Sequence, residues 1–183
     1  MERDEALAFL KKHLKTKNLL KHTYAVEAVM RGVAEHLDED GNRWALAGLM
    51  HDIDYDQTGD DPSLHSIRGA DMLAEAGFDE EIVDAVRVHN DFHGLPRQSK
   101  MAKALYAVDP LTGLIVAAAL VHPDRTLTAL DVDFVMNRYA ENSFARGARR
   151  DAIAACDELG IELEEFVGIA LESMQEIRGD LGL

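Results

Sequence analysis

The stretch Trp44-Ala-Leu-Ala-Gly-Leu-Met-His51-Asp52 is an almost wholly apolar run that ends in a histidine and an aspartate. An acidic segment, Ile53-Asp-Tyr-Asp56, follows it directly. In a helix, His51 extends the position of Ala47 by one turn, and Asp52 follows about 100° further round. Neighbouring residues at the end of a helix can both reach one ion. This stretch therefore predicts a buried helix that delivers two metal-binding groups to the core.

The composition of the whole chain favours helices over a sheet. Hydrophobic residues make up 47% of the sequence and aromatic residues only 6%. The apolar residues are mostly Ala, Leu, Val and Ile, with few β-branched or aromatic runs. A length of 183 residues suits one domain with a substantial core. We therefore predict a single all-α domain over residues 1–183.

Hydrophobic periodicity and turn residues divide the chain into helices with short connections. The turn Asp38-Glu-Asp-Gly-Asn42 separates two helices, Ser63 is predicted to cap another, and Pro110 is predicted to interrupt a long one. The predicted helices cover residues 4–15, 18–37, 43–51, 63–75, 79–89, 99–121 (with the interruption), 129–139, 146–159 and 163–177. No segment has the pattern of a strand.

Four more polar residues fall on apolar helical stripes, which points their side chains inward. They are His22, His65, His89 and Asp109. Singly, each histidine is an ordinary core residue, and Asp109 could equally cap a helix that starts at the next proline. Burying so many polar groups without a shared partner costs several kcal/mol, a cost that a common metal removes. Together with His51-Asp52, these residues predict a two-metal site.

The net charge of −15 argues against several classes of partner. An acidic surface disfavours nucleic-acid polymers, whose binding depends on phosphate contacts, and it disfavours anionic membranes. The longest apolar stretch, residues 111–121, is too short to span a bilayer, and the N-terminus lacks the pattern of a signal peptide. A cytoplasmic location is therefore expected. A small phosphorylated ligand stays compatible, since local cations and metals can reverse the field at one cleft.

The order His22, then His51-Asp52, then Asp109 resembles the HD-domain superfamily of metal-dependent phosphohydrolases. Two-metal members insert further histidines before the last aspartate, and His65 and His89 match these in order and context. The resemblance covers residues 18–121, which we predict to be the metal-binding core. It implies an HD-type helical bundle in which residues 122–183 form additional C-terminal helices.

The resemblance also implies a function. It implies a phosphomonoesterase or phosphodiesterase that acts on a nucleotide or another small phosphoester through a metal-activated water. Asp52 would be catalytic and would bridge two ions. His22, His51 and Asp109 would hold the first ion, and His65 and His89 the second. The mixed nitrogen and oxygen donor set suits Fe, Mn, Co, Ni or Zn.

The chemistry of the substrate is less determined by the sequence. Arg68, Arg97 and Lys100 are candidates for phosphate contact, although a solvated helix face is the better explanation for each of them taken singly. The basic cluster at residues 146–150 could cover the cleft or pair with surface carboxylates. Two other functions stay open, namely an HD-fold di-iron oxygenase and a non-catalytic nucleotide-binding sensor. A homodimer is also left open.

Overall fold

A computed structural model describes all residues from 1 to 183 and contains helices and turns but no strand, which confirms the all-α prediction. The helices of the first part are α1 (Arg3–His13), α2 (Lys17–His36), α3 (Gly41–Met50), α4 (Tyr55–Thr58), α5 (Ile67–Glu75) and α6 (Glu80–Val88). The second part contains α7 (Lys100–Val121), α8 (Val132–Ala140), α9 (Arg150–Ala154), α10 (Leu163–Glu176) and α11 (Arg178–Leu181). Three 3-10 turns join them: η1 (Asp91–His93), η2 (Leu127–Ala129) and η3 (Ala155–Leu159).

The predicted interruption at Pro110 is wrong, because α7 runs unbroken from Lys100 to Val121 with the proline inside it. Proline removes one helical hydrogen bond, the one that its missing N–H would donate to the carbonyl of Tyr106. The residues on both sides are buried, including Leu105, Leu111 and Leu114. Packing along the whole helix therefore outweighs the loss of one hydrogen bond.

Three other predicted helices differ from those in the structure. The helix expected from residue 43 begins at Gly41, since the Asp40 carboxylate accepts hydrogen bonds from the backbone N–H groups of Asn42 and Arg43. Ser63 does not cap α5, which begins at Ile67. The helix expected over 146–159 is divided into α9 and η3, and residues 146–149 form a loop.

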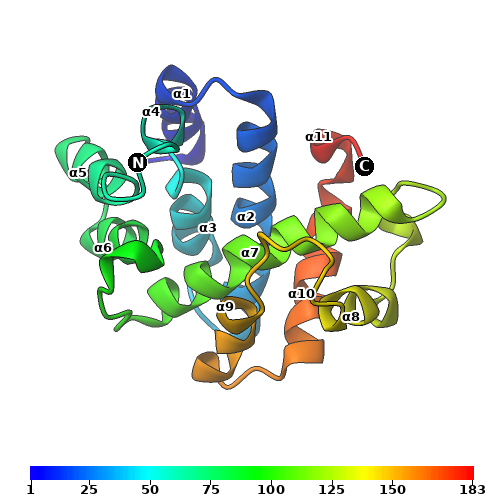
Figure 1. Ribbon diagram of the computed structural model, residues 1–183. Helices are drawn as coiled ribbons and strands as arrows, with labels where there is room; N and C mark the ends of the chain where they lie inside the picture. The colour runs from blue at the N-terminus through cyan, green and yellow to red at the C-terminus, as the bar shows by residue number, and fades with distance from the viewer.

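Helix α7 lies at the centre of the molecule and crosses it diagonally, with α2 beside it (Figure 1). It packs against α2, α6, α8, α9 and α10. By length and composition alone α7 could cross a membrane, but 61% of its most apolar window is buried inside the fold. Its apolar character is therefore that of a core helix.

Helices α2 and α3 pack against each other more extensively than any other pair in the fold, and Gly48 permits their close approach. A Cβ atom on Gly48 would lie 2.7 Å from the backbone carbonyl oxygen of Val26. No side chain fits there without moving one helix. Since His22 lies one turn before Val26 and His51 three residues after Gly48, this approach brings the two imidazole rings together, with centroids 5.1 Å apart.

Candidate metal centre

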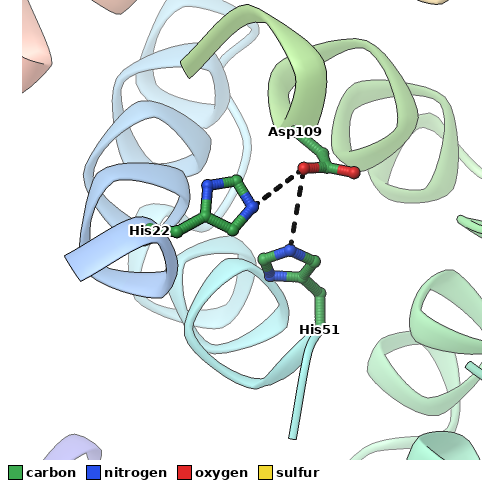
Figure 2. A group of neighbouring side chains, drawn as sticks. All are labelled: His22, His51 and Asp109. Carbon is green, nitrogen blue, oxygen red and sulfur yellow. Dashed lines mark ion pairs between the residues drawn. The ribbon is translucent and has the colours of Figure 1, made fainter. Parts of the chain in front are cut away.

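The six predicted ligands converge on one place from five segments of the chain. His22 lies on α2 and Asp109 on α7, while His51 and Asp52 follow the last turn of α3. The other two histidines, His65 and His89, lie in the turn before α5 and directly after α6. Figure 2 shows His22, His51 and Asp109 pointing toward one another from α2, the end of α3 and α7.

The two oxygens of the Asp52 carboxylate face different pairs of histidines. Oδ2 lies 3.4 Å from Nε2 of His51 and 3.8 Å from Nε2 of His22. Oδ1 lies 3.5 Å from Nε2 of His65 and 3.7 Å from Nε2 of His89. The carboxylate therefore stands between two sets of imidazole nitrogens, as a group shared by two ions would.

Asp109 completes the set on the α2 side. Its Oδ1 lies 2.9 Å from Nε2 of His22 and 3.8 Å from Nε2 of His51. Donor atoms of His22, His51 and Asp109 all lie within 4.8 Å of one another, and the same holds for His51, Asp52 and His89. Each group has the size of the donor set around a single ion.

The carboxylates of Asp52 and Asp109 stabilise positive charge at this site although it is largely buried. The side chain of His51 is 0% exposed, that of Asp52 7%, and that of Asp109 33%, so the site opens toward Asp109. Burial alone would lower the pKa of His51, but the Asp52 and Asp109 carboxylates outweigh it and raise the pKa to about 9. Burial likewise opposes ionisation of Asp52, yet His51 holds its pKa well below the usual range.

The Nδ1 atoms of two buried histidines are bound by backbone carbonyls. Nδ1 of His51 lies 2.8 Å from the Gly48 oxygen, and Nδ1 of His89 lies 2.7 Å from the Val86 oxygen. Because a carbonyl only accepts, each Nδ1 carries the hydrogen and donates. The lone pair of the neutral ring is then on Nε2, the atom that faces the centre.

Side chains orient the other two histidines in the same way. Nδ1 of His65 lies 3.1 Å from Oδ1 of Asp54, and Nδ1 of His22 lies 3.3 Å from Oγ1 of Thr112. The Thr112 hydroxyl donates to the carbonyl of Asp109, so its oxygen is free to accept from His22. All four imidazoles thus present Nε2 to the same volume.

Asp54 is the functional residue that sequence reasoning missed. Its side chain is fully buried, and its Oδ2 accepts from the backbone N–H groups of Ser66 and Gly69. It therefore caps the start of α5 and orients His65 at once. Burial opposes its ionisation, but the hydrogen bond from His65 and the N–H groups lower its pKa. Helical periodicity cannot find such a residue, because Asp54 lies in a turn.

The role of Gly69 follows from Asp54. Gly69 lies four residues after His65, beside the Asp54 carboxylate. A Cβ atom at Gly69 would lie 3.1 Å from Oδ1 of Asp54, so the group that approaches is this carboxylate. The glycine keeps space for the side chain that orients the histidine.

An unpartnered nitrogen atom in the site indicates that these residues fit a divalent transition metal. Nε2 of His51 is buried and has no hydrogen-bond partner. A buried polar atom without a partner costs about 1–3 kcal/mol. A metal ion supplies that partner, and the set of imidazole nitrogens and carboxylate oxygens is one that Fe, Mn, Co, Ni and Zn accept.

The three cations predicted to contact substrate lie outside the opening of the site. Arg68 is exposed, and Lys100 pairs with Glu39 at 2.8 Å. Arg97 stacks on the ring of Tyr106, with its guanidinium carbon 3.6 Å from the ring centroid. None of the three lines the two cavities that adjoin the ligands.

The basic cluster of the C-terminal part does lie at these cavities. Arg149 lines one cavity with His65, His89 and Asp109. Arg146 lines the other with His22 and Asp109. Of the two interpretations left open by the sequence, the structure places Arg146 over the cleft, while Arg149 lies over the cleft and also pairs with Asp91.

The chain also matches known proteins over the segment that carries these ligands. Residues 19–119 match the HD domain family. The chain is 31% identical over 98 residues to Ribonuclease Y from Oleidesulfovibrio alaskensis, covering 54% of this chain and 18% of that protein. It is 31% identical over 105 residues to Ribonuclease Y from Lawsonia intracellularis, covering 57% and 20%. The chain thus spans about a fifth of the length of these relatives. No solved structure matches it.

Proposed function

Because the chain belongs to the HD domain family, we propose that it is a metal-dependent phosphohydrolase acting on a nucleotide or another small phosphoester. One observation carries the proposal. Four imidazole Nε2 atoms and two carboxylates face one partly open volume, and each imidazole is held by a bond to its Nδ1. A metal centre of this kind, open on one side, is a site for hydrolysis and not only for structure.

In this proposal the residues divide between two ions. His22, His51 and Asp109 would hold one, His65 and His89 would hold the other, and Asp52 would be shared. A bound divalent metal supplies an acidified water as nucleophile and offsets negative charge that develops on the phosphoryl group. The protein residues fix the direction of each Nε2 and carboxylate oxygen before substrate arrives.

The buried side of the site excludes water. His51 and His89 are almost fully buried, and Tyr55 packs edge-on against His65 with ring centroids 4.9 Å apart. Substrate can therefore approach only from the side of Asp109. Charges in such a partly dry site interact more strongly than in water, which favours binding of a phosphate group.

The relatives and the charge of the chain favour different sizes of substrate. The matched relatives are named Ribonuclease Y, which favours a phosphoester of a ribonucleotide. The net charge of −15 opposes the binding of a long polyanion. We therefore propose a small nucleotide substrate, with RNA as the second candidate. We also propose that the protein works in the cytoplasm without a membrane partner, supported by the burial of α7.

The test is a panel of phosphoesters assayed on protein reconstituted separately with Mn, Fe, Co and Ni. The panel contains mononucleotides, dinucleoside polyphosphates, cyclic dinucleotides and a short RNA. We expect metal-dependent release of phosphate or nucleotide from a small member, abolished by Asp52→Ala. Preferred cleavage of RNA would make RNA, and not a small nucleotide, the proposed substrate. If the protein hydrolyses no phosphoester with any metal and its iron form consumes oxygen, the result would support an oxygenase and contradict a hydrolase.

A further inference from the structure

Two cavities adjoin each other at the metal centre, and we call them together the groove. One has a volume of about 400 Å³ and is lined by His65, His89 and Phe92 among others. The second has a volume of about 380 Å³ and is lined by His22 and Arg146 among others. Asp109, Pro110 and Gly147 line both. The groove therefore runs over Asp109, from Phe92 at one end to Arg146 at the other.

One wall of this groove comes from outside the segment that matches the family. The loop between α8 and α9 crosses the face of α7 (Figure 1), and residues 145–148 line the groove opposite Pro110 and Gly113. Family similarity ends at residue 119, so this wall is supplied by the C-terminal part of the chain. We call residues 141–149 the groove loop.

Arg150 holds the groove loop in one shape. Its guanidinium donates to six backbone carbonyls, those of Arg138, Tyr139, Glu141, Phe144, Ala145 and Ala148, at 2.6–3.2 Å. A loop fixed in this way loses little conformational freedom when a ligand binds. The wall of the groove is therefore preorganised.

The groove loop presents one arginine that no acidic group neutralises. Arg146 is exposed, lines the groove with His22 and Asp109, and makes no ion pair. Arg149 differs, because Asp91 and the Tyr106 hydroxyl occupy its guanidinium. In a chain with 34 acidic and 19 basic residues, a free arginine beside the metal ligands is a site for an anion.

An aromatic ring lies at the other end of the groove. Phe92 lines the groove and is 63% exposed. The backbone there is fixed, since the Phe92 N–H donates to Oδ1 of Asn90, whose side-chain amide in turn donates to the carbonyls of Pro62 and His65. An exposed ring on a fixed backbone offers a face on which a flat base can stack.

We propose that the groove binds a mononucleotide, with Arg146 contacting the phosphate and Phe92 stacking on the base. This inference rests on the proposed function only for the position of the reacting phosphate. It assigns recognition of the substrate to the groove loop and to the turn after α6. The groove suits one nucleotide, and the net charge of −15 disfavours a longer polyanion.

The test compares adenosine monophosphate with ribose 5-phosphate, which keeps the phosphate and lacks the base. Binding to manganese-loaded protein is measured by calorimetry, and phosphate release in the same sample shows how much ligand stays intact. Arg146→Gln should weaken both ligands about 10-fold or more, as loss of a charge-assisted hydrogen bond predicts. Phe92→Ala should weaken only the adenosine ligand, by about 5-fold or more, and Phe92→Trp should restore it.

Arg125→Gln is the control, because Arg125 is an exposed arginine on the turn after α7 and lines neither cavity of the groove. It should weaken neither ligand. Equal loss of both ligands in Phe92→Ala, or unchanged binding in Arg146→Gln, would overturn the inference even if the protein hydrolyses other phosphoesters. Binding that depends on both residues, in a protein that hydrolyses no member of the phosphoester panel, would leave the inference standing and overturn the proposed function.

Discussion

At the scale of single residues, the site depends on side chains that hold the histidines. Asp54 is the only one of these that carries a full charge, and it touches His65 through Nδ1. A carboxylate in this position fixes the ring and increases the basicity of the opposite nitrogen. The affinity for metal should therefore depend on a residue that is itself no ligand.

Asp54→Asn tests this dependence. The amide keeps the size of the side chain but removes the charge, so His65 becomes a weaker ligand. We expect metal affinity to fall about 10–100-fold, measured by competition with a chelator. Asp60→Asn makes the same change on an exposed side chain in the same connection between α3 and α5 and should leave the affinity unchanged. Equal affinity in Asp54→Asn and the unchanged protein would show that Asp54 does not tune the site.

At the scale of helices, the spacing of α2 and α3 decides whether His22 meets His51. Gly48 is the contact that sets this spacing, since its missing side chain lets the carbonyl of Val26 approach. The same glycine offers its own carbonyl to Nδ1 of His51. Helix packing and ligand orientation are therefore coupled at one residue.

Gly48→Ala should separate the two helices. A Cβ atom 2.7 Å from backbone oxygen cannot be accommodated without a shift. We expect a loss of about 1–3 kcal/mol in the free energy of unfolding, as for other overpacked sites. Metal affinity should fall as well. Gly168→Ala is the matched control, because its Cβ would meet only Val132 at 3.7 Å.

The stability of the control variant, Gly168→Ala, should also change in a defined direction. Gly168 lies inside α10, where alanine is the better helix former by up to about 1 kcal/mol. Chemical denaturation should therefore show a small gain for Gly168→Ala and a loss for Gly48→Ala. A loss of the same size in both variants would mean that Gly48 has no special role at the contact.

The groove loop likewise depends on a single residue, Arg150, for its hydrogen bonds. Arg150→Lys keeps the charge but replaces a planar group with five donors by a compact ammonium with three. We expect the free energy of unfolding to fall by about 1–3 kcal/mol, because carbonyls lose their donors. Nucleotide binding should weaken, while metal content stays the same. Arg178→Lys, whose guanidinium meets one carbonyl, should change stability by less than about 0.5 kcal/mol.

The sequence predicted most of the helices and all six residues that converge at the site. Periodicity works for His22 and Asp109, because each lies on a helix whose apolar stripe shows which face is buried. It does not work for the groove loop, where Arg150 is fixed by carbonyls that lie up to 12 residues earlier. It also failed at Pro110, because tertiary packing outweighs the local preference of proline.

The cations show the same limit. Charge and spacing alone gave Arg68, Arg97 and Lys100 as phosphate contacts. Only the arrangement of distant segments shows that Arg97 stacks on Tyr106 and that Arg146 lies beside His22. A site formed by residues that are far apart in the sequence cannot be predicted from local sequence patterns.

At the scale of the whole molecule, the metal centre joins the segments α2, α3, α5, α6 and α7, so ligand binding should stabilise the entire fold. Without a cation, the buried Nε2 of His51 has no hydrogen-bond partner. Adding metal should then raise the midpoint of thermal unfolding. A cation at 100 times its dissociation constant adds about 2.7 kcal/mol per site.

For a chain of this size, this free energy corresponds to roughly 5–11 °C per ion. Differential scanning calorimetry of chelator-treated protein, with and without added Mn, measures the shift. Magnesium at the same concentration is the control, since it prefers oxygen ligands and should stabilise the protein less. The same midpoint in all three samples would contradict a metal centre that links these helices.

The most direct test of the central claim is the metal content of the purified chain beside that of Asp52→Ala, measured by elemental analysis after reconstitution. Asp52 faces both sets of histidines, so the account predicts about two ions per chain in the unchanged protein. In Asp52→Ala it predicts loss of at least one of these ions in a protein that is still folded. Absence of any transition metal from the unchanged protein, or equal metal content in Asp52→Ala, would contradict it.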